Sequence, residues 1–141
     1  MTNQEAFDQA VTWCLAQGRK SEGGRLVTFA SREVVSRPMC LYRGPDGLRC
    51  AVGTLIPDVE YQGGFDDGRL VLDAVQACVP SLAGVSTRLL SALQNVHDQE
   101  KPSEWRAWFL GVAVDFGLTW PLDSDVVPVD VEVVSEVGAI V

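Results

Sequence analysis

The sequence predicts an α+β fold in which about four helices pack on a small antiparallel sheet built around a β-hairpin. Four segments carry apolar residues at helical spacing, and two extended runs flank one strong turn signal. A length of 141 residues suffices for a single core. We expect residues 1–118 to form one globular domain. Residues 119–141, rich in valine, proline and acidic residues, should form a strand or a loose tail.

The first helix is predicted by its start and stop signals. Thr2 and Glu5 have the spacing of a capping box, and Gly18 provides a helix end. Apolar residues recur between them at helical spacing, so they should face the core. Cys14 lies on this apolar stripe, and we interpret it as a small buried residue rather than a reactive thiol.

The strongest local signal is the stretch 37–57, RPMCLYRGPDGLRCAVGTLIP. Pro45 presets φ for the first turn position, and Asp46 suits the second. Gly47 can adopt the left-handed conformation that closes such a turn with a bulge. This turn chemistry predicts a hairpin whose loop is Pro45-Asp46-Gly47.

Residues 39–43 and 48–52 then become the two strands of the hairpin, and residues 26–29 could add a third strand. Because side chains alternate along a strand, one face of the hairpin should enter the core. That face would carry Cys40, Tyr42, Leu48, Cys50 and Val52. The opposite face would place Arg43 directly across from Arg49.

Three further helices follow. The second should end near Cys78, the third should begin within 81–86 and end near Glu100, and the fourth should be capped by Ser103 and ended by Gly117. We expect the apolar face of the fourth helix to lie in the core. It comprises Trp105, Trp108, Phe109, Val112 and Phe116.

Charge is unevenly distributed along the chain. The formal net charge of −8 argues against direct binding of nucleic acid, because a polyanion would be repelled. Seven of the eleven basic residues lie between Arg19 and Arg49, whereas no lysine or arginine follows Arg106. The protein therefore has a basic early region and an acidic end.

The N-terminus MTNQEAFDQ lacks the basic and apolar regions of an export signal, and no apolar run is long enough to span a bilayer. We expect a protein of the bacterial cytoplasm with no membrane partner. The four cysteines lie in apolar surroundings, so a disulfide framework is not expected either.

The opposed arginines suggest an anion site. Like charges across a strand pair are destabilising unless an anion lies beside them. The anion could be a carboxylate of this protein, such as Glu60, Asp66, Asp67 or the acidic tail. Alternatively it could be a phosphate or nucleotide ligand. The residues that would bind such a ligand are Arg43, Arg49, Tyr42 and Arg37.

A metal site is the alternative interpretation. Cys40, Cys50, His97 and Asp98 could form a metal-stabilised domain or a small enzyme, with Cys14 as another candidate ligand. No Cys-x-x-Cys pair is present, and the predicted hairpin places the first two cysteines diagonally. His97 is the only histidine, and its neighbour along the helix is poorly placed to orient it for catalysis. We therefore expect a protein that is not an enzyme and has no cofactor.

One resemblance extends over residues 2–118. The hairpin string Cys-x-Tyr-Arg-Gly-Pro-Asp-Gly-x-x-Cys-Ala-Val-Gly-x-Leu-Ile-Pro, the helical string Leu-Gln-x-x-His-Asp and a tryptophan-rich helix ending in Phe-Gly-Leu occupy 40–57, 93–98 and 105–118. Together they resemble small uncharacterised proteins of phages and bacterial genomes. The resemblance implies an accessory protein of a mobile element that acts by binding.

Such a protein would interfere with a host defence system, either by sequestering an anionic, nucleotide-like signal or by blocking a host protein. The first route would use the arginine pair, and the second would use the acidic end or an exposed apolar patch. A homo-oligomer is compatible with both.

Overall fold

The protein is described by a computed structural model that covers residues 1–28, 31, 34–66 and 70–122. This part of the chain is mostly helical, with four α-helices, several short 3-10 turns and one two-stranded ribbon. None of its helices has the length and apolar character needed to cross a membrane. The helices are α1 (Asn3–Gln17), α2 (Leu72–Ala77), α3 (Thr87–Gln99) and α4 (Trp105–Phe116).

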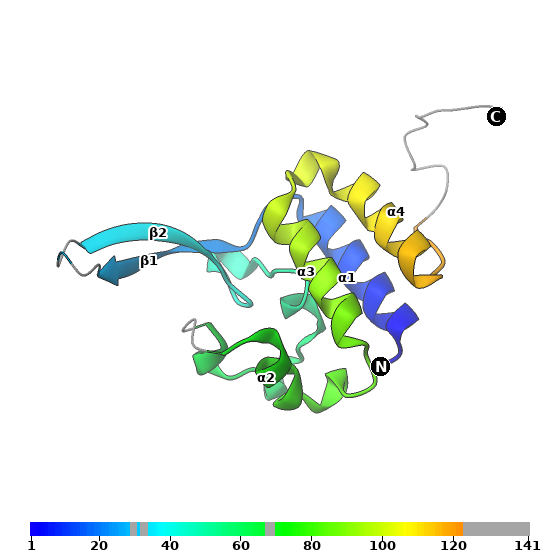
Figure 1. The fold of residues 1–141 in the computed structure, drawn as a ribbon, viewed down its shortest axis with the longest axis horizontal. Helices are drawn as coiled ribbons and strands as arrows, with labels where there is room; N and C mark the ends of the chain where they lie inside the picture. Colours follow the sequence, from blue (N-terminus) through cyan, green and yellow to red (C-terminus); the bar gives the residue numbers. More distant parts are fainter. Residues whose placement is uncertain (29–30, 32–33, 67–69, 123–141) are drawn as a thin grey trace.

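The body of the molecule consists of α1, α3 and α4, which lie side by side (Figure 1). The short α2 lies near the start of α3. The core is formed where the apolar stripes of the three long helices meet, and the 51–56 segment closes it from one side. Its largest fully buried side chains include Phe7 of α1, Leu93 of α3 and Trp105 of α4.

Local capping signals confirm the first helix. The Thr2 side chain accepts a hydrogen bond from the Glu5 backbone N–H, and the Glu5 carboxylate accepts one from the Thr2 backbone N–H, which completes the capping box. Gly18 ends α1 with φ 66°. Cys14 is fully buried on the apolar face of this helix, as predicted.

The other helices follow their predicted ranges, with two exceptions in α4. Ser103 does not cap this helix, because residues 102–104 form a 3-10 turn and the helix begins at Trp105. Trp108 is 51% exposed rather than in the core. Successive residues of an α-helix are rotated by about 100° around its axis. Trp108 therefore lies at the edge of the helix face on which Trp105, Phe109 and Val112 are buried.

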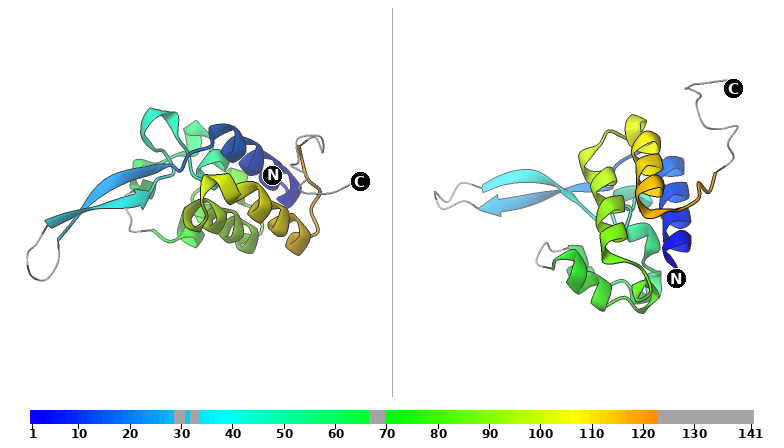
Figure 2. Two further views of the ribbon diagram at one scale, coloured as in Figure 1. Left: turned by 90° about the horizontal axis from the view of Figure 1, so that it is seen from above. Right: turned by 45° about the vertical axis from the view of Figure 1, so that its right-hand side comes forward.

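The antiparallel pair of this protein is a ribbon made by β1 (Glu22–Thr28) and β2 (Val34–Cys40), with Glu22 opposite Cys40 and Thr28 opposite Val34. The ribbon projects away from the helical body (Figures 1 and 2). The prediction that the helices pack on the sheet is therefore wrong. The extra strand predicted at 26–29 corresponds to the end of β1, which the structure describes as far as Thr28.

The hairpin predicted over 39–52 is also wrong, although its turn forms. Gly47 adopts the predicted left-handed conformation with φ 77°, but Asp46 also has a positive φ of 59°, so the turn is not the type I turn that its residues predict. The Gly44 N–H donates to the Leu48 carbonyl at 2.7 Å, which is the first bond that the hairpin would make. The described chain then diverges on both sides instead of forming strands.

Side chains from other segments explain why the strand pair does not extend. The backbone N–H groups of Tyr42 and Arg43 donate to the Asp66 carboxylate at 2.6 and 3.1 Å. On the other side, the Arg49 N–H donates to the Gln17 side chain at 2.9 Å. Because Gly44 and Leu48 form a hydrogen-bonded pair, the next bond of the hairpin would use the Tyr42 N–H, whereas the N–H groups of Arg43 and Arg49 would point outward. A hydrogen bond to a charged acceptor is stronger than a neutral backbone pair, so the Asp66 carboxylate replaces the Tyr42 bond of the ladder.

The segment after α4 begins against the helical body. The Gln4 side chain forms two hydrogen bonds with the backbone of Thr119, at 2.9 Å each, and Trp120 packs edge-on against Phe7. The strand expected within 119–141 lies outside the described residues.

Candidate functional site

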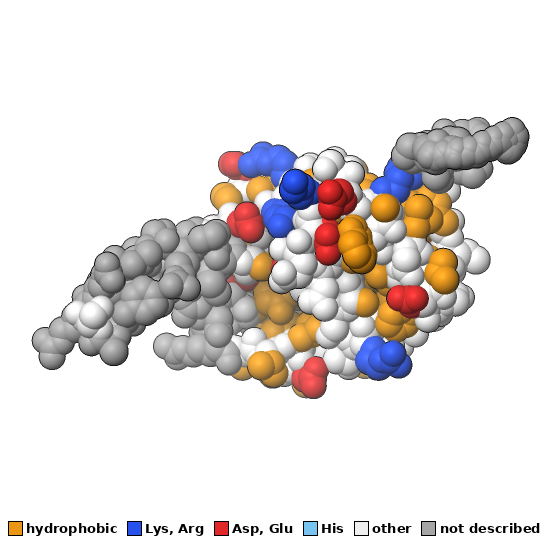
Figure 3. All heavy atoms as spheres, turned by 45° about the horizontal axis from the view of Figure 1, so that its top comes forward, with side chains coloured by type: hydrophobic (Ala, Val, Ile, Leu, Met, Phe, Trp, Pro, Cys, Tyr) orange, Lys and Arg blue, Asp and Glu red, His pale blue; other side chains and the backbone are white. Residues whose placement is uncertain are grey.

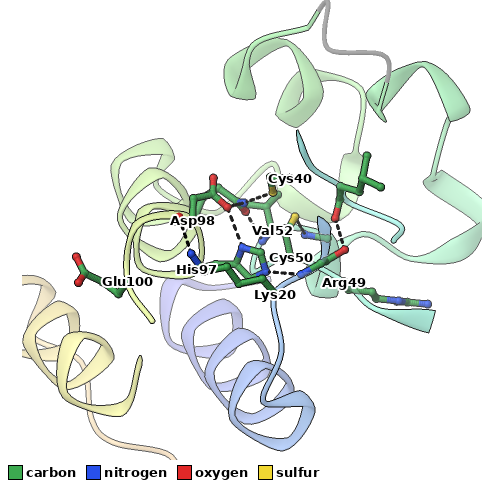
Figure 4. A network of polar contacts seen from close by, with 12 residues as sticks. Lys20, Cys40, Arg49, Cys50, Val52, His97, Asp98 and Glu100 are labelled. Carbon is green, nitrogen blue, oxygen red and sulfur yellow. Dashed lines mark hydrogen bonds and ion pairs between the residues drawn. The ribbon is translucent and has the colours of Figure 1, made fainter. Parts of the chain in front are cut away.

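Two polar clusters correspond to the two site predictions. The His97 cluster comprises Ser21, Cys40, Gln94, His97 and Asp98, with Cys50 beside it. The Asp58 cluster comprises Arg43, Arg49 and Asp58. Figure 4 shows the side chains of Cys40, Cys50, His97 and Asp98 converging from the end of β2, the turn that follows residue 50, and α3.

His97 is fully buried and uses both ring nitrogens. Its Nδ1 lies 2.8 Å from the Asp98 carboxylate, and its Nε2 accepts a hydrogen bond from the Ser21 backbone N–H at 3.0 Å. A backbone N–H can only donate, so Nε2 carries no proton in this arrangement. The ring is therefore neutral, with its proton on Nδ1 and directed at the carboxylate.

The environment acts on the His97 pKa in both directions. Burial lowers the pKa of His97, while the hydrogen bonds to Asp98 and Cys40 raise it, and the net direction is upward from the usual value. The Ser21 N–H favours the neutral ring, because protonation would place two donors against each other. The ring also stacks on the buried Trp105, with centroids 5.2 Å apart.

Gln94 connects the ribbon to α3. Its Nε2 donates to the Cys40 thiol at 2.9 Å and to the Asp98 carboxylate at 3.0 Å, and its Oε1 accepts from the Val52 N–H at 3.0 Å. The sequence string Leu-Gln-x-x-His-Asp contained this residue, but no role was predicted for it. The i, i+4 spacing of Gln94 and Asp98 was the available signal.

Cys14 and Cys40 are free thiols of low acidity. Burial raises the pKa of Cys14 to about 12, and a hydrogen bond with the Cys50 thiol together with burial raises the pKa of Cys40 far above its usual range. The prediction that Cys40 and Cys50 lie diagonally across a hairpin is wrong, because that hairpin does not form. A neutral thiol is a poor nucleophile, so this environment does not activate Cys14 or Cys40.

The cluster holds three candidate metal ligands but in an unsuitable protonation state. One atom each of Cys40, His97 and Asp98 lies within 4.8 Å of the others. Coordination through Nδ1 would move the imidazole proton to Nε2, which faces the Ser21 N–H. Ligation would therefore break a buried hydrogen bond and create a donor–donor contact. The donor set does not fit a metal without rearrangement.

The predicted arginine pair does come together, but not across strands. The same oxygen of Asp58 accepts from Arg43 Nη2 and from Arg49 Nη2, at 3.0 Å each. The anion between the arginines is thus a carboxylate of the protein. It is neither Glu60 nor Asp66, two of the carboxylates considered from the sequence.

Arg43 is held by three acceptors. Beyond Asp58, its guanidinium donates to the carbonyls of Gly53 at 2.8 Å and Ile56 at 2.7 Å, and it lies over the Tyr61 ring. Among the described residues, the Arg49 guanidinium has fewer contacts, since it lies over the Trp13 ring and donates to Asp58. Both arginine side chains are about 80% buried, whereas Asp58 is 79% exposed.

Of the remaining predicted ligand residues, Tyr42 does not join this cluster. The Tyr42 ring packs edge-on against Phe65, and burial raises the pKa of its hydroxyl. Arg37 lies on β2 with its Cα opposite that of Arg25, but its side chain lies outside what the structure describes. Glu60 accepts from the backbone and hydroxyl of Ser81 instead.

Asp66 is an organising residue that sequence reasoning considered only as a charge partner. Its carboxylate accepts from two backbone N–H groups and from the Tyr61 hydroxyl. Burial and this hydrogen bond raise the pKa of Tyr61 to about 12. Asp66 thereby shapes the loop that carries Arg43.

An open groove of about 1200 Å³ lies along α1. Three carboxylates line it, from Glu5, Asp8 and Asp46, together with the 39% exposed Trp13 and apolar groups of Leu48 and Ala16. Its lining residues include no lysine or arginine, and their one positive group is the N-terminal ammonium of Met1, which donates to the Ser81 carbonyl. The groove is therefore acidic and partly apolar.

No family model, curated protein or solved structure matches this chain.

Proposed function

We propose that this chain is a non-enzymatic accessory protein of a phage or another mobile element, which acts by binding a basic segment of a host protein in the groove along α1. Interference with a host defence system is the setting that the sequence resemblance suggests. The observation that carries the proposal is the composition of the groove, which combines three carboxylates with an exposed tryptophan.

The groove suits a peptide with lysine or arginine side chains. Acidic walls attract cationic side chains. Arg49 lies over the Trp13 ring, and the part of this ring that stays exposed offers an aromatic surface for the aliphatic stems of such side chains. The net charge of −8 would also increase the rate of encounter with a basic partner. An anionic ligand would be repelled from the same surface.

The surroundings of the arginine pair favour this route over sequestration of a nucleotide-like signal. An incoming phosphate would have to displace Asp58, and the Gly53 and Ile56 carbonyls that hold Arg43 would face it. Separating the two guanidinium groups from the Asp58 carboxylate would cost free energy. This cost would offset the free energy gained from their contact with the phosphate.

Exposed apolar side chains do not offer a comparable surface on the face seen in Figure 3. There they lie in several separate groups among charged residues. Isolated exposed apolar groups are normal on a protein surface. The groove along α1 is thus the better candidate for the host-blocking route.

The test uses neutral variants of matched charge. A fluorescently labelled lysine- and arginine-rich peptide of about ten residues should bind the protein, and the double variant Asp8→Asn/Asp46→Asn should weaken binding at least tenfold at physiological salt. The control Asp73→Asn/Asp115→Asn removes the same charge from exposed positions outside this groove. It should weaken binding less than twofold.

A photo-crosslinking residue at Ala16 then identifies the partner in bacterial cells. We expect a crosslinked protein with a basic segment, lost in the groove variant and retained in the control. The groove would be refuted as the binding surface if both double variants lost the same amount of peptide affinity. It would also be refuted if neither double variant changed that affinity.

A further inference from the structure

The two outer edges of the ribbon differ, and the difference follows from the backbone alone. The Leu41 N–H donates to the Ser21 carbonyl, at the pair that continues the β1–β2 register by one step. This bond sets the phase of the antiparallel ladder, in which hydrogen-bonded and non-hydrogen-bonded pairs alternate. Arg25 opposite Arg37 is therefore a hydrogen-bonded pair, and Gly24 opposite Pro38 is not.

Residues of the non-hydrogen-bonded pairs direct their backbone N–H and C=O groups outward. On β1 these residues present four N–H donors along the open edge, and on β2 the matching edge includes Pro38, which has no N–H. A proline at such a position is a common obstacle to further strand pairing. The outward residues are Glu22, Gly24, Leu26 and Thr28 on β1, and Val34, Ser36, Pro38 and Cys40 on β2.

The open edge of β1 has no strand partner within the described residues, where the sheet has the order β1-β2. The ribbon extends from the body without a helix packed along it (Figure 2). An isolated two-stranded ribbon is at best marginally stable in water, whereas three or more strands stabilise one another. The open edge of β1 is therefore the edge at which a further strand can pair.

We propose that the partner is a second copy of this chain, paired antiparallel through the two β1 edges about a two-fold axis. The result is a four-stranded sheet of order β2-β1-β1-β2. Such an interface is self-complementary and needs no other surface. Pro38 then lies on both outer edges of the sheet, so pairing stops at the dimer instead of continuing into a fibre.

Charge also permits contact at this place. The whole chain carries −8, so two copies repel each other over most of their surfaces. Residues 21–40 contain three arginines and two glutamates, a net charge of +1. The ribbon is therefore a part of the protein that a second copy can approach without that repulsion, and this inference is independent of the groove along α1.

The matched test substitutes the two residues of one non-hydrogen-bonded pair. Leu26→Pro removes an outward N–H from the β1 edge, and Ser36→Pro removes one from the β2 edge. Native mass spectrometry and light scattering at micromolar concentration should show a dimer for the wild type and for Ser36→Pro. The Leu26→Pro variant should be mainly monomeric, because the dissociation constant of its dimer should be at least ten times that of the wild type.

Hydrogen exchange of the wild type keeps the test informative if Leu26→Pro disturbs the ribbon. In concentrated protein the outward N–H groups of Gly24, Leu26 and Thr28 should be protected and lose protection on dilution, while that of Ser36 exchanges fast at both concentrations. A wild type that is monomeric at every concentration would overturn the proposal. So would a dimer that Leu26→Pro leaves intact, or equal exchange at the two edges.

Discussion

The His97 cluster and the Asp58 cluster each contain an aspartate that accepts from a basic side chain, but they differ in their relation to water. In the first, a buried imidazole accepts from a backbone N–H and donates to the Asp98 carboxylate. In the second, one exposed carboxylate accepts from two largely buried guanidinium groups. The sequence alone suggests metal binding for the first cluster and ligand binding for the arginines of the second.

Burial explains why the two clusters should differ in energy. Removing one partner of a buried hydrogen bond leaves the other group unpaired, because water cannot reach it. This costs about 1–3 kcal/mol of stability, in addition to the cost of any cavity. An exposed ion pair contributes about 0–1 kcal/mol, because water and salt replace the lost partner. Five substitutions, a pH series and a zinc titration can test this comparison, and they are given from the largest expected effect to the smallest.

His97→Ala should lower the free energy of unfolding by about 3 kcal/mol. It leaves the Ser21 N–H and the Asp98 carboxylate without their buried partner and opens a cavity against Trp105. Urea unfolding measures the change. The control Asn95→Ala, at an exposed position of the same helix, should stay within about 0.5 kcal/mol of the wild type.

Gly53→Ala tests the segment between the two clusters. It should lower the free energy of unfolding by about 2 kcal/mol. Its N–H donates to the Cys50 thiol and its carbonyl accepts from Arg43, while a Cβ would collide with the Tyr42 backbone. Gly111→Ala is the matched control, because its Cβ would meet open space on α4. It should stabilise the protein by up to about 1 kcal/mol.

Stability should fall as the pH rises above 9, the ordinary pKa of a thiol. The folded protein keeps the Cys14 proton up to about pH 12, whereas the unfolded chain releases it near pH 9. The unfolded state therefore binds fewer protons, and about 2 kcal/mol is lost between pH 9 and 11. Unfolding curves of the wild type and of Cys14→Ala should converge in this range. Parallel curves would contradict the argument.

Arg43→Met should lower the free energy of unfolding by about 1–2 kcal/mol, and Arg49→Met should lower it by less than about 1 kcal/mol. Arg43 loses two carbonyl acceptors as well as Asp58, whereas Arg49 loses one carboxylate and its contact with Trp13. Thermal unfolding at low and high salt separates the two effects, because only the ion-pair part is screened. Equal costs for both residues would show that the carbonyl bonds contribute little.

Zinc should have the smallest effect. Because Nε2 of His97 is already an acceptor for Ser21, we expect neither a chelator nor added zinc to move the melting temperature by more than about 1 °C. A rise of several degrees with zinc, abolished in Cys40→Ser, would mean that the cluster rearranges to bind the metal.

Parts of the site could be predicted from sequence, and the limits have physical causes. The buried state of Cys14 followed from its place on an apolar stripe, and the meeting of Arg43 with Arg49 followed from their symmetric spacing around a turn. Their bridging carboxylate did not, since Asp58 belongs to a separate 3-10 turn. The contact of Ser21 with His97 joins positions 76 residues apart, for which a single sequence carries no local signal.

The sequence by itself determined the features whose causes lie within a few residues. The capping box of α1, the left-handed glycines at 18 and 117 and the turn at 45–47 all depend on neighbouring backbone and side-chain groups. The tertiary structure decided where the strands form. A turn forms at 45–47, yet the carboxylate of Asp66 takes the Tyr42 N–H that a hairpin would have used. Local turn geometry permits a strand pair, but the competition among distant acceptors for the same donors determines whether it forms.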